Sequence, residues 1–214
     1  MKASSKRLLL TALALSLAAC AAPKRREPLP DRPVDQTPAA PTQAAAPAAP
    51  VKDPQTRFDE ALAAYKAKDF KLAREGFAAL AKEHPELSGP LTNLGILDAK
   101  ANNRPAAIAQ FARAVAANPD NAIAYNWLGI LYREARDYPR AEQAYLRSLA
   151  IKPSEPAVVL NLGILYDVYL KRPAQALERY REYQQLTGSK ELKVTAWIKA
   201  LEATQAPVSA EVKS

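Results

Sequence analysis

Apolar residues recur at helical spacing through most of this chain, most clearly over residues 122–155. One helix face there is formed by residues at i, i+3, i+4 and i+7, namely Tyr125, Leu128, Gly129 and Tyr132. A second apolar face is formed by Tyr138, Ala141, Tyr145, Ser148 and Leu149. It ends before Pro153, because proline cannot continue a helix interior. The pattern predicts two short helices that bury their apolar faces against each other.

The same pattern recurs at intervals of 34 residues. This interval separates the prolines that follow the second helices, Pro85, Pro119 and Pro153. It also separates the Leu-Gly pairs that begin at Leu94, Leu128 and Leu162. An Ala-x3-aromatic pair begins at Ala73, Ala107 and Ala141, and again, one residue late, at Ala176. These phased signals predict a series of helix–turn–helix repeats.

The repeat resembles the tetratricopeptide repeat, whose first helix reads Trp-x2-Leu-Gly-x2-Tyr and whose second reads Ala-x3-Phe before a proline. The segment from Tyr125 to Tyr132 matches the first signature nearly completely, whereas Asp98 replaces the tyrosine expected in the second repeat. The resemblance implies an all-α fold, a solenoid of about four helix-turn-helix repeats with a C-terminal capping helix. Gly95, Gly129 and Gly163 would then allow close helix contacts.

The predicted segments are a signal peptide at 1–20, a Pro/Ala-rich linker at 21–53, the repeat domain at 54–204 and a tail at 205–214. The repeats are expected at about 54–87, 88–121, 122–155 and 156–188, followed by a capping helix at 189–204. Ser189 is expected to cap that helix and Leu192 to lie on its apolar side. The loop between Tyr65 and Asp69 is expected to be one residue shorter than its counterpart in the third repeat.

The N-terminus has the features of an export signal. Lys2, Lys6 and Arg7 precede a largely apolar run, Leu8–Ala19, which is shorter than the ~20 residues that span a bilayer. The only cysteine, Cys20, follows Leu17-Ala18-Ala19, and this junction resembles the lipobox of bacterial lipoproteins. The resemblance implies acylation of Cys20, and the absence of an aspartate at position 21 implies the outer membrane. An ordinary signal peptide is the alternative.

The segment that follows, residues 21–53, contains eight prolines, nine alanines, no glycine and no aromatic residue. It cannot bury a core, so it is predicted to be a disordered linker. Proline-rich chain extends by ~3.1 Å per residue, which gives a reach on the order of 100 Å. Lys24-Arg25-Arg26 is expected either to meet anionic headgroups or to be a solvated charge cluster.

The sequence contains no motif that indicates catalysis, a metal or a cofactor, so a non-enzymatic protein is expected. The only histidine, His84, precedes Pro85 and is expected to be solvated at a helix end. No His, Cys or carboxylate cluster has metal-site spacing. Without residues 1–20, which carry three cations and no carboxylate, the formal charge of +8 falls to +5. Basic and acidic residues alternate through the repeats, which disfavours nucleic acid and any phosphate track.

In tetratricopeptide repeats the first helices line a groove that commonly holds an extended peptide or a partner helix. The resemblance carries this role to Asn93, Ile96, Lys100, Asn126, Trp127, Ile130, Arg133, Asn161 and Ile164. The isoleucines would form an apolar floor, and the asparagines would bond a peptide backbone. The alternative is that the isoleucines and asparagines serve packing between repeats, with Trp127 in the inter-repeat core.

Signal and repeats together resemble the envelope lipoproteins of Gram-negative bacteria that assist pilus or secretin assembly. The predicted function is an adaptor, lipid-anchored at the periplasmic face of the outer membrane, that binds a protein or peptide. The alternatives are a scaffold for peptidoglycan enzymes or proteases, and an accessory subunit of an envelope transport complex.

The anchor makes the first testable prediction. If Cys20 is acylated, Cys20→Ser should release the protein from outer-membrane fractions or block its processing. Fractionation and intact-mass measurement of wild type and variant check this. An unchanged mass and distribution would contradict the lipoprotein hypothesis.

Overall fold

The computed structural model describes residues 52–188 and 191–205, which lie in one compact unit, Ala49–Ser214. The predicted signal peptide, Cys20, most of the linker, Ser189 and most of the tail fall outside the described residues. In the part of the chain that is described, no helix is long and apolar enough to cross a membrane.

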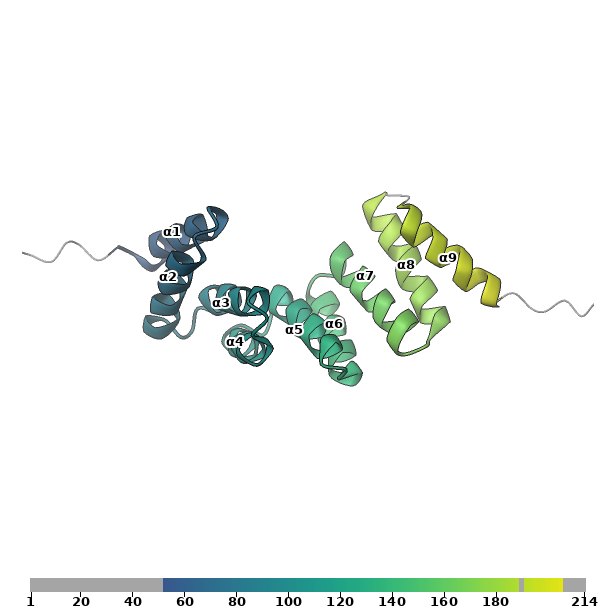
Figure 1. The fold of residues 1–214 in the computed structure, drawn as a ribbon, viewed down its shortest axis with the longest axis horizontal. Helices are drawn as coiled ribbons and strands as arrows, with labels where there is room; N and C mark the ends of the chain where they lie inside the picture. The colour runs from purple at the N-terminus through teal and green to yellow at the C-terminus, as the bar shows by residue number, and fades with distance from the viewer. Residues whose placement is uncertain (1–51, 189–190, 206–214) are drawn as a thin grey trace, which may run out of the picture. The chain divides into compact units, whose positions relative to one another are not determined.

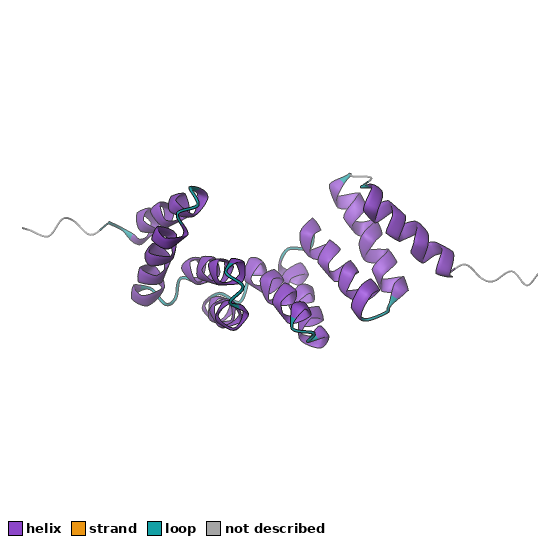
Figure 2. Cartoon of the chain, viewed as in Figure 1, coloured by secondary structure: helices purple, strands orange, loops and turns teal. Residues whose placement is uncertain are grey.

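Every regular element in the described ranges is a helix, which confirms the predicted all-α class (Figure 2). The helices are α1 Pro54–Lys66, α2 Phe70–Glu83, α3 Ser88–Lys100, α4 Arg104–Ala117, α5 Ala122–Glu134, α6 Tyr138–Ile151, α7 Pro156–Ile164, α8 Pro173–Thr187 and α9 Leu192–Gln205. The hairpins α1–α2, α3–α4, α5–α6 and α7–α8 follow one another in chain order (Figure 1). The second helix of each hairpin also packs against the first helix of the next unit.

Side chains and prolines next to the helices explain where many of them begin and end. Asp69 and Asp137 accept hydrogen bonds from the backbone N–H of Leu72 and Arg140, at 3.0 and 3.1 Å. Such caps satisfy donors that the first helical turn leaves unpaired. α2, α4 and α6 each end two residues before a proline, whose ring disfavours helical geometry in the preceding residue.

The loop of the first hairpin has the same length as that of the third, contrary to the sequence-based expectation. Three residues separate α1 from α2, and three separate α5 from α6. The expectation was wrong because it treated Tyr65 as the counterpart of Tyr132. The 34-residue period instead places Ala64 at that position.

The extra residue of the fourth repeat is accommodated within its first helix. α7 passes into a π-helical turn, η1, at Leu165–Tyr169. The N–H of Leu170 donates to the carbonyl oxygen of Leu165 at 3.0 Å, which is the i→i+5 bond of a π-helix. α8 therefore begins 35 residues after α6, yet Ala176 and Tyr180 are still fully buried against the rest of the repeat.

Each of the three later hairpins is closed by a glycine that faces an aromatic ring. A β-carbon added to Gly129 would lie 2.5 Å from the ring of Tyr145, and one added to Gly95 would lie 2.8 Å from the ring of Phe111. Gly163 bears the same relation to a ring on α8. These rings are fully buried, so they have no room to move aside. The glycines therefore set the distance between the two helices.

In the first hairpin the two helices also approach closely, but the glycine is on the second helix. Its α1 carries Ala61 at the position of the three later glycines, and its α2 carries Gly76. A β-carbon on Gly76 would lie 2.8 Å from the Cβ of Ala61. One of the two facing positions must therefore lack a side chain, and Phe77 fills the space beside them.

Charged residues cover the N-terminal end of the repeat array. Glu60 occupies the position at which the later repeats bury Leu94, Leu128 and Leu162, and Arg57 occupies another position that is apolar in those repeats. Arg57 binds the carboxylate of Glu83 with both terminal nitrogens, and Glu60 pairs with Lys52. A repeat array needs such polar ends to stay soluble.

At the C-terminal end, α9 packs against α8 in the register of a fifth first helix. Val194, Ile198 and Leu201 are buried, and the Trp197 ring lies 5.3 Å from the Tyr180 ring. Leu192 is 88% exposed, so the expectation that it lies on the apolar side was wrong. It is the first residue of the helix, where the neighbouring helix no longer covers it.

The glycine contacts make a prediction about stability. Gly129→Leu should lower the free energy of unfolding by ~1–3 kcal/mol or more, because the new side chain would overpack the seam against Tyr145. Urea unfolding followed by circular dichroism measures it. The variant Gly129→Leu with Tyr145→Ala should lose less stability than the sum of the single changes, since the second change frees space. Additive losses would mean that the ring is not the obstacle.

Candidate protein-binding groove

The three isoleucines predicted to form the groove floor occupy equivalent positions on successive first helices. Ile96, Ile130 and Ile164 are each half-buried. Ile96 packs against the core of the first repeats, whereas Ile130 and Ile164 pack against the core of the later ones. They therefore serve inter-repeat packing and still present part of each side chain on the surface. We call these isoleucines, with Asn126, Arg133 and Asn161, the groove row.

The asparagines use part of their hydrogen-bonding capacity within the protein. Asn161 donates from Nδ2 to Oδ1 of Asn126 at 3.3 Å, which joins α7 to α5. Asn93 donates to the carbonyl oxygen of Gly89 at 3.0 Å, within its own helix. Asn126 is also one residue out of register with the other two. The three asparagines expected to bond a peptide backbone therefore differ. Asn126 and Asn161 bond each other, and Asn93 bonds its own helix.

Trp127 and Lys100 do not lie on the floor with the isoleucines. The Trp127 ring stacks on Phe111 of α4, with centroids 5.9 Å apart and an interplanar angle of 7°. It therefore lies in the seam between the second and third repeats, as the alternative interpretation expected. The Lys100 ammonium lies over the rings of Tyr65 and Phe70, at 5.2 and 6.0 Å from their centroids.

Arg133 is the charged member of the groove row, and it forms no ion pair with the described residues. Its Nη1 is buried and has no hydrogen-bond partner within the described residues, and the same holds for the hydroxyl of Tyr145. Burial raises the pKa of the Tyr145 phenol above its ordinary range, and the nearby Arg133 charge opposes that shift. In the fourth repeat the corresponding pair is Asp167 and Tyr180, which are hydrogen-bonded at 3.2 Å.

One buried charge was missed by the sequence analysis. Asp98, where a tyrosine was expected, is buried and lies 2.8 Å from an Nη of Arg74 on α2. The pair joins the first two repeats, since burying a carboxylate without a partner would be costly. The sequence signal that could have indicated this ion pair was an acidic residue at a core position where the repeat has an aromatic one.

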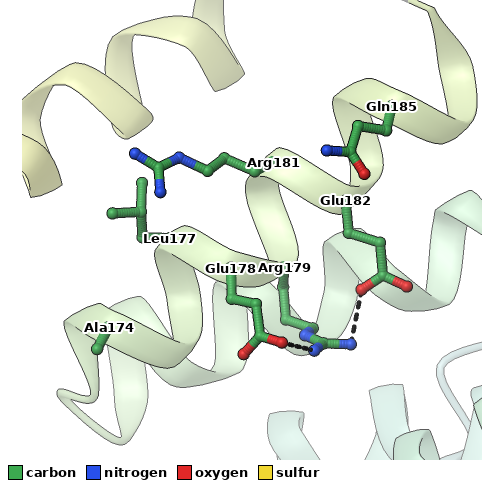
Figure 3. Close-up of a pocket in the computed structure, with 7 residues that line it drawn as sticks. All are labelled: Ala174, Leu177, Glu178, Arg179, Arg181, Glu182 and Gln185. Atoms are coloured by element: carbon green, nitrogen blue, oxygen red, sulfur yellow. Dashed lines mark hydrogen bonds and ion pairs between the residues drawn. The ribbon is translucent and has the colours of Figure 1, made fainter.

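The described residues contain no group of three His, Cys, Asp or Glu side chains that could hold a metal ion. His84, a candidate by its residue type alone, is half-buried with its Nδ1 3.4 Å from a carboxylate oxygen of Glu86. A hollow of about 620 Å³ lies along α8 (Figure 3). Its lining comes from one helix, and Arg179 already pairs with both Glu178 and Glu182 at 2.6 Å. It gathers no set of unpaired groups.

Comparison with known proteins agrees with this architecture. The sequence model of the tetratricopeptide repeat matches residues 92–156. No curated protein sequence matches the chain. Among solved structures, PilF of Pseudomonas aeruginosa is similar at 20% identity and a TM-score of 0.62, covering 71% of this chain and 68% of PilF.

Two further structures show the same fold. MamA of Desulfovibrio magneticus RS-1 matches at 16% identity and a TM-score of 0.62, covering 73% of this chain and 87% of that one. A chain of the Cut9–Hcn1 hetero-tetramer of APC/C matches at 18% identity and a TM-score of 0.61, covering 69% of this chain and 29% of that one.

The fold is thus an all-α helical-repeat solenoid, a class in which protein-protein interaction is the common role. More particularly, residues 92–156 match the tetratricopeptide repeat, as the spacing of Leu-Gly pairs and prolines predicted, and solved structures of this fold cover about 70% of the chain.

The unpaired hydroxyl of Tyr145 makes a prediction. Tyr145→Phe should raise the free energy of unfolding by about 1 kcal/mol, because it removes a buried donor that has no acceptor. Phe77 and Phe111 already occupy this position in the first two repeats. Tyr180→Phe is the matched control and should lower stability by about 1 kcal/mol, since its hydroxyl is bonded to Asp167. Denaturant titration of both variants measures the two signs. Equal losses would contradict the assignment.

Proposed function

We propose that this protein is a non-enzymatic adaptor that holds a protein partner along the groove row and is anchored to the outer membrane through acylated Cys20. The observation that carries the binding role is the recurrence of Ile96, Ile130 and Ile164. They remain partly exposed at equivalent positions, whereas the neighbouring Leu94, Leu128 and Leu162 are buried. A solvent-facing apolar row on a rigid scaffold suits a partner segment that crosses several repeats.

Polar groups beside the isoleucines would give such a partner its orientation. Asn161 keeps its side-chain oxygen available beside the bond that it donates to Asn126, and an extended peptide offers backbone donors and acceptors. Arg133 has a buried donor without an acceptor. A carboxylate or carbonyl oxygen of the partner would satisfy that donor if the side chain turned outward.

Two likenesses support the proposed context. The Cut9–Hcn1 structure is described as a hetero-tetramer, so a protein of similar fold forms an assembly with another protein. The fold is also similar to PilF, which agrees with a role in pilus or secretin assembly. A scaffold for cell-wall enzymes or proteases and a transport subunit are the alternative contexts.

The groove is tested by photo-crosslinking in cells that express the full chain. A benzophenone amino acid at Ile130 should give discrete protein adducts, whereas the same residue at Gln143, exposed on α6, should not. Adding Asn126→Ala and Arg133→Ala should weaken the adduct at Ile130, with one or two positions costing more than ~2 kcal/mol of binding.

The matched control carries Arg113→Ala and Leu146→Ala, both exposed on second helices, and should leave the adduct unchanged. Circular dichroism of each variant verifies folding. Adducts of equal intensity at Ile130 and Gln143 would place binding elsewhere on the protein.

A further inference from the structure

The turns that join the two helices of each hairpin carry unpaired positive charge. Six exposed cations in these turns or at the adjoining helix ends form no ion pair within the described part of the chain. They are Lys66, Lys68, Lys71, Lys100, Arg136 and Lys171. We call the surface that they form, together with the turns themselves, the basic edge. Because the helices of a hairpin are antiparallel, the turns that join successive hairpins lie at the opposite edge.

Contacts between neighbouring turns make the basic edge continuous. Lys100, at the end of α3, lies 5.2 Å from the centroid of the Tyr65 ring at the end of α1. Arg104, at the start of α4, bonds Glu134 at the end of α5 at 2.9 Å. The third and fourth turns meet where the rings of Tyr138 and Tyr169 lie 5.2 Å apart.

The carboxylates on this edge are already engaged. Asp98 is buried against Arg74, Glu134 pairs with Arg104, and Asp137 both caps α6 and pairs with Arg140. Asp69 accepts a hydrogen bond from the N–H of Leu72 but forms no ion pair, so its charge offsets part of the positive charge at Lys68 and Lys71. The edge still has an excess of cations. At the opposite edge the described turn residues have the reverse balance. They hold Glu86, Asp120, Glu155 and Glu191, with Lys152 as the lysine among them.

Three of the six cations occupy a backbone conformation that does not favour them. Lys68, Arg136 and Lys171 have φ values of 66°, 61° and 53°, in the left-handed region. Asn102 adopts φ 58° at the same position in the second repeat, so a residue better suited to this region fits the turn. The fold does not require a long cationic side chain at these places.

Apolar side chains are exposed among the cations. Phe70, which adjoins Lys71, is 44% exposed, and Tyr169, two residues before Lys171, is 40% exposed. Aromatic side chains are enriched at protein-binding surfaces, whose rim is polar. The same arrangement gives a partner both long-range attraction and apolar contact.

We propose that the basic edge is a docking surface for an acidic protein segment that carries aromatic or aliphatic side chains. An acidic segment is complementary in charge to the six cations, and the exposed Phe70 and Tyr169 offer apolar contact to its side chains. Binding to an anionic bilayer is the alternative outcome of the test. The surface is distinct from the groove row, so the proposal does not depend on the groove.

The test compares two charge variants of the full chain. The edge variant carries Lys66→Gln, Lys71→Gln, Lys100→Gln and Arg136→Asn, where asparagine tolerates the left-handed backbone. The control removes four cations elsewhere through Lys82→Gln, Arg113→Gln, Lys152→Gln and Lys199→Gln. The probe is a fluorescein-labelled peptide of repeated Glu-Glu-Phe triplets, and a Lys-Lys-Phe peptide tests the sign of the charge. Fluorescence anisotropy gives Kd at several salt concentrations.

Wild type and control should bind the acidic peptide with Kd values within about twofold of each other, and the edge variant should bind about tenfold more weakly. The salt dependence should also fall in the edge variant. The single variant Arg136→Asn changes an exposed residue and should show a smaller loss in the same direction, which keeps the test valid if the quadruple variant unfolds. Ile130→Ser in the groove row should leave this Kd unchanged.

Equal Kd values for the edge and control variants would overturn the proposal. Sedimentation with phosphatidylcholine–phosphatidylglycerol vesicles supplies the second arm. A loss of vesicle binding in the edge variant, with peptide binding unchanged, would assign the surface to the membrane and would also overturn it.

Discussion

The contact between a glycine on the first helix and an aromatic ring on the second is the constraint on which this fold depends. A β-carbon at Gly95, Gly129 or Gly163 would lie 2.5–2.8 Å from a fully buried ring. The ring therefore serves as a spacer that fixes how closely the helices approach. Because the two helices of a hairpin already pack this closely, the remaining apolar surface of the hairpin can be buried only by its neighbours. Stability then comes from neighbour contacts along the array.

This constraint also determines what reaches the surface. Where the leucine beside each glycine turns inward, the isoleucine two residues further is left half-buried at the junction of neighbouring repeats. The partial exposure of the groove row is therefore a consequence of the packing, and its residues combine a structural and a surface role. The turns that join the two helices of each hairpin have no such role in the core. Their side chains are free to carry charge, and the carboxylates among them are held by caps and ion pairs.

The sequence was sufficient to predict the fold because its signals are local and repeated. Leu-Gly pairs and prolines at a 34-residue period determine the number of hairpins and their order. Side-chain contacts between repeats were less predictable. Asn126 is one position out of phase with Asn161, yet the two amides bond because they come from adjacent helices. In the first repeat the glycine is on the second helix, as Gly76, and the first helix has Ala61 instead. This departs from the motif but preserves the close contact.

The one-residue insertion in the fourth repeat shows how strongly this contact constrains the rest. A longer loop could have absorbed the extra residue, but the helix instead widens into a π turn at Leu165–Tyr169. Gly163, just before this turn, still faces Tyr180, and Asp167 within it bonds the hydroxyl of that ring. Tyr169 is thereby turned out against Tyr138 of the preceding repeat. Preservation of the buried seam thus places an exposed aromatic beside Lys171, so that a packing requirement in the core helps to shape the surface at the basic edge.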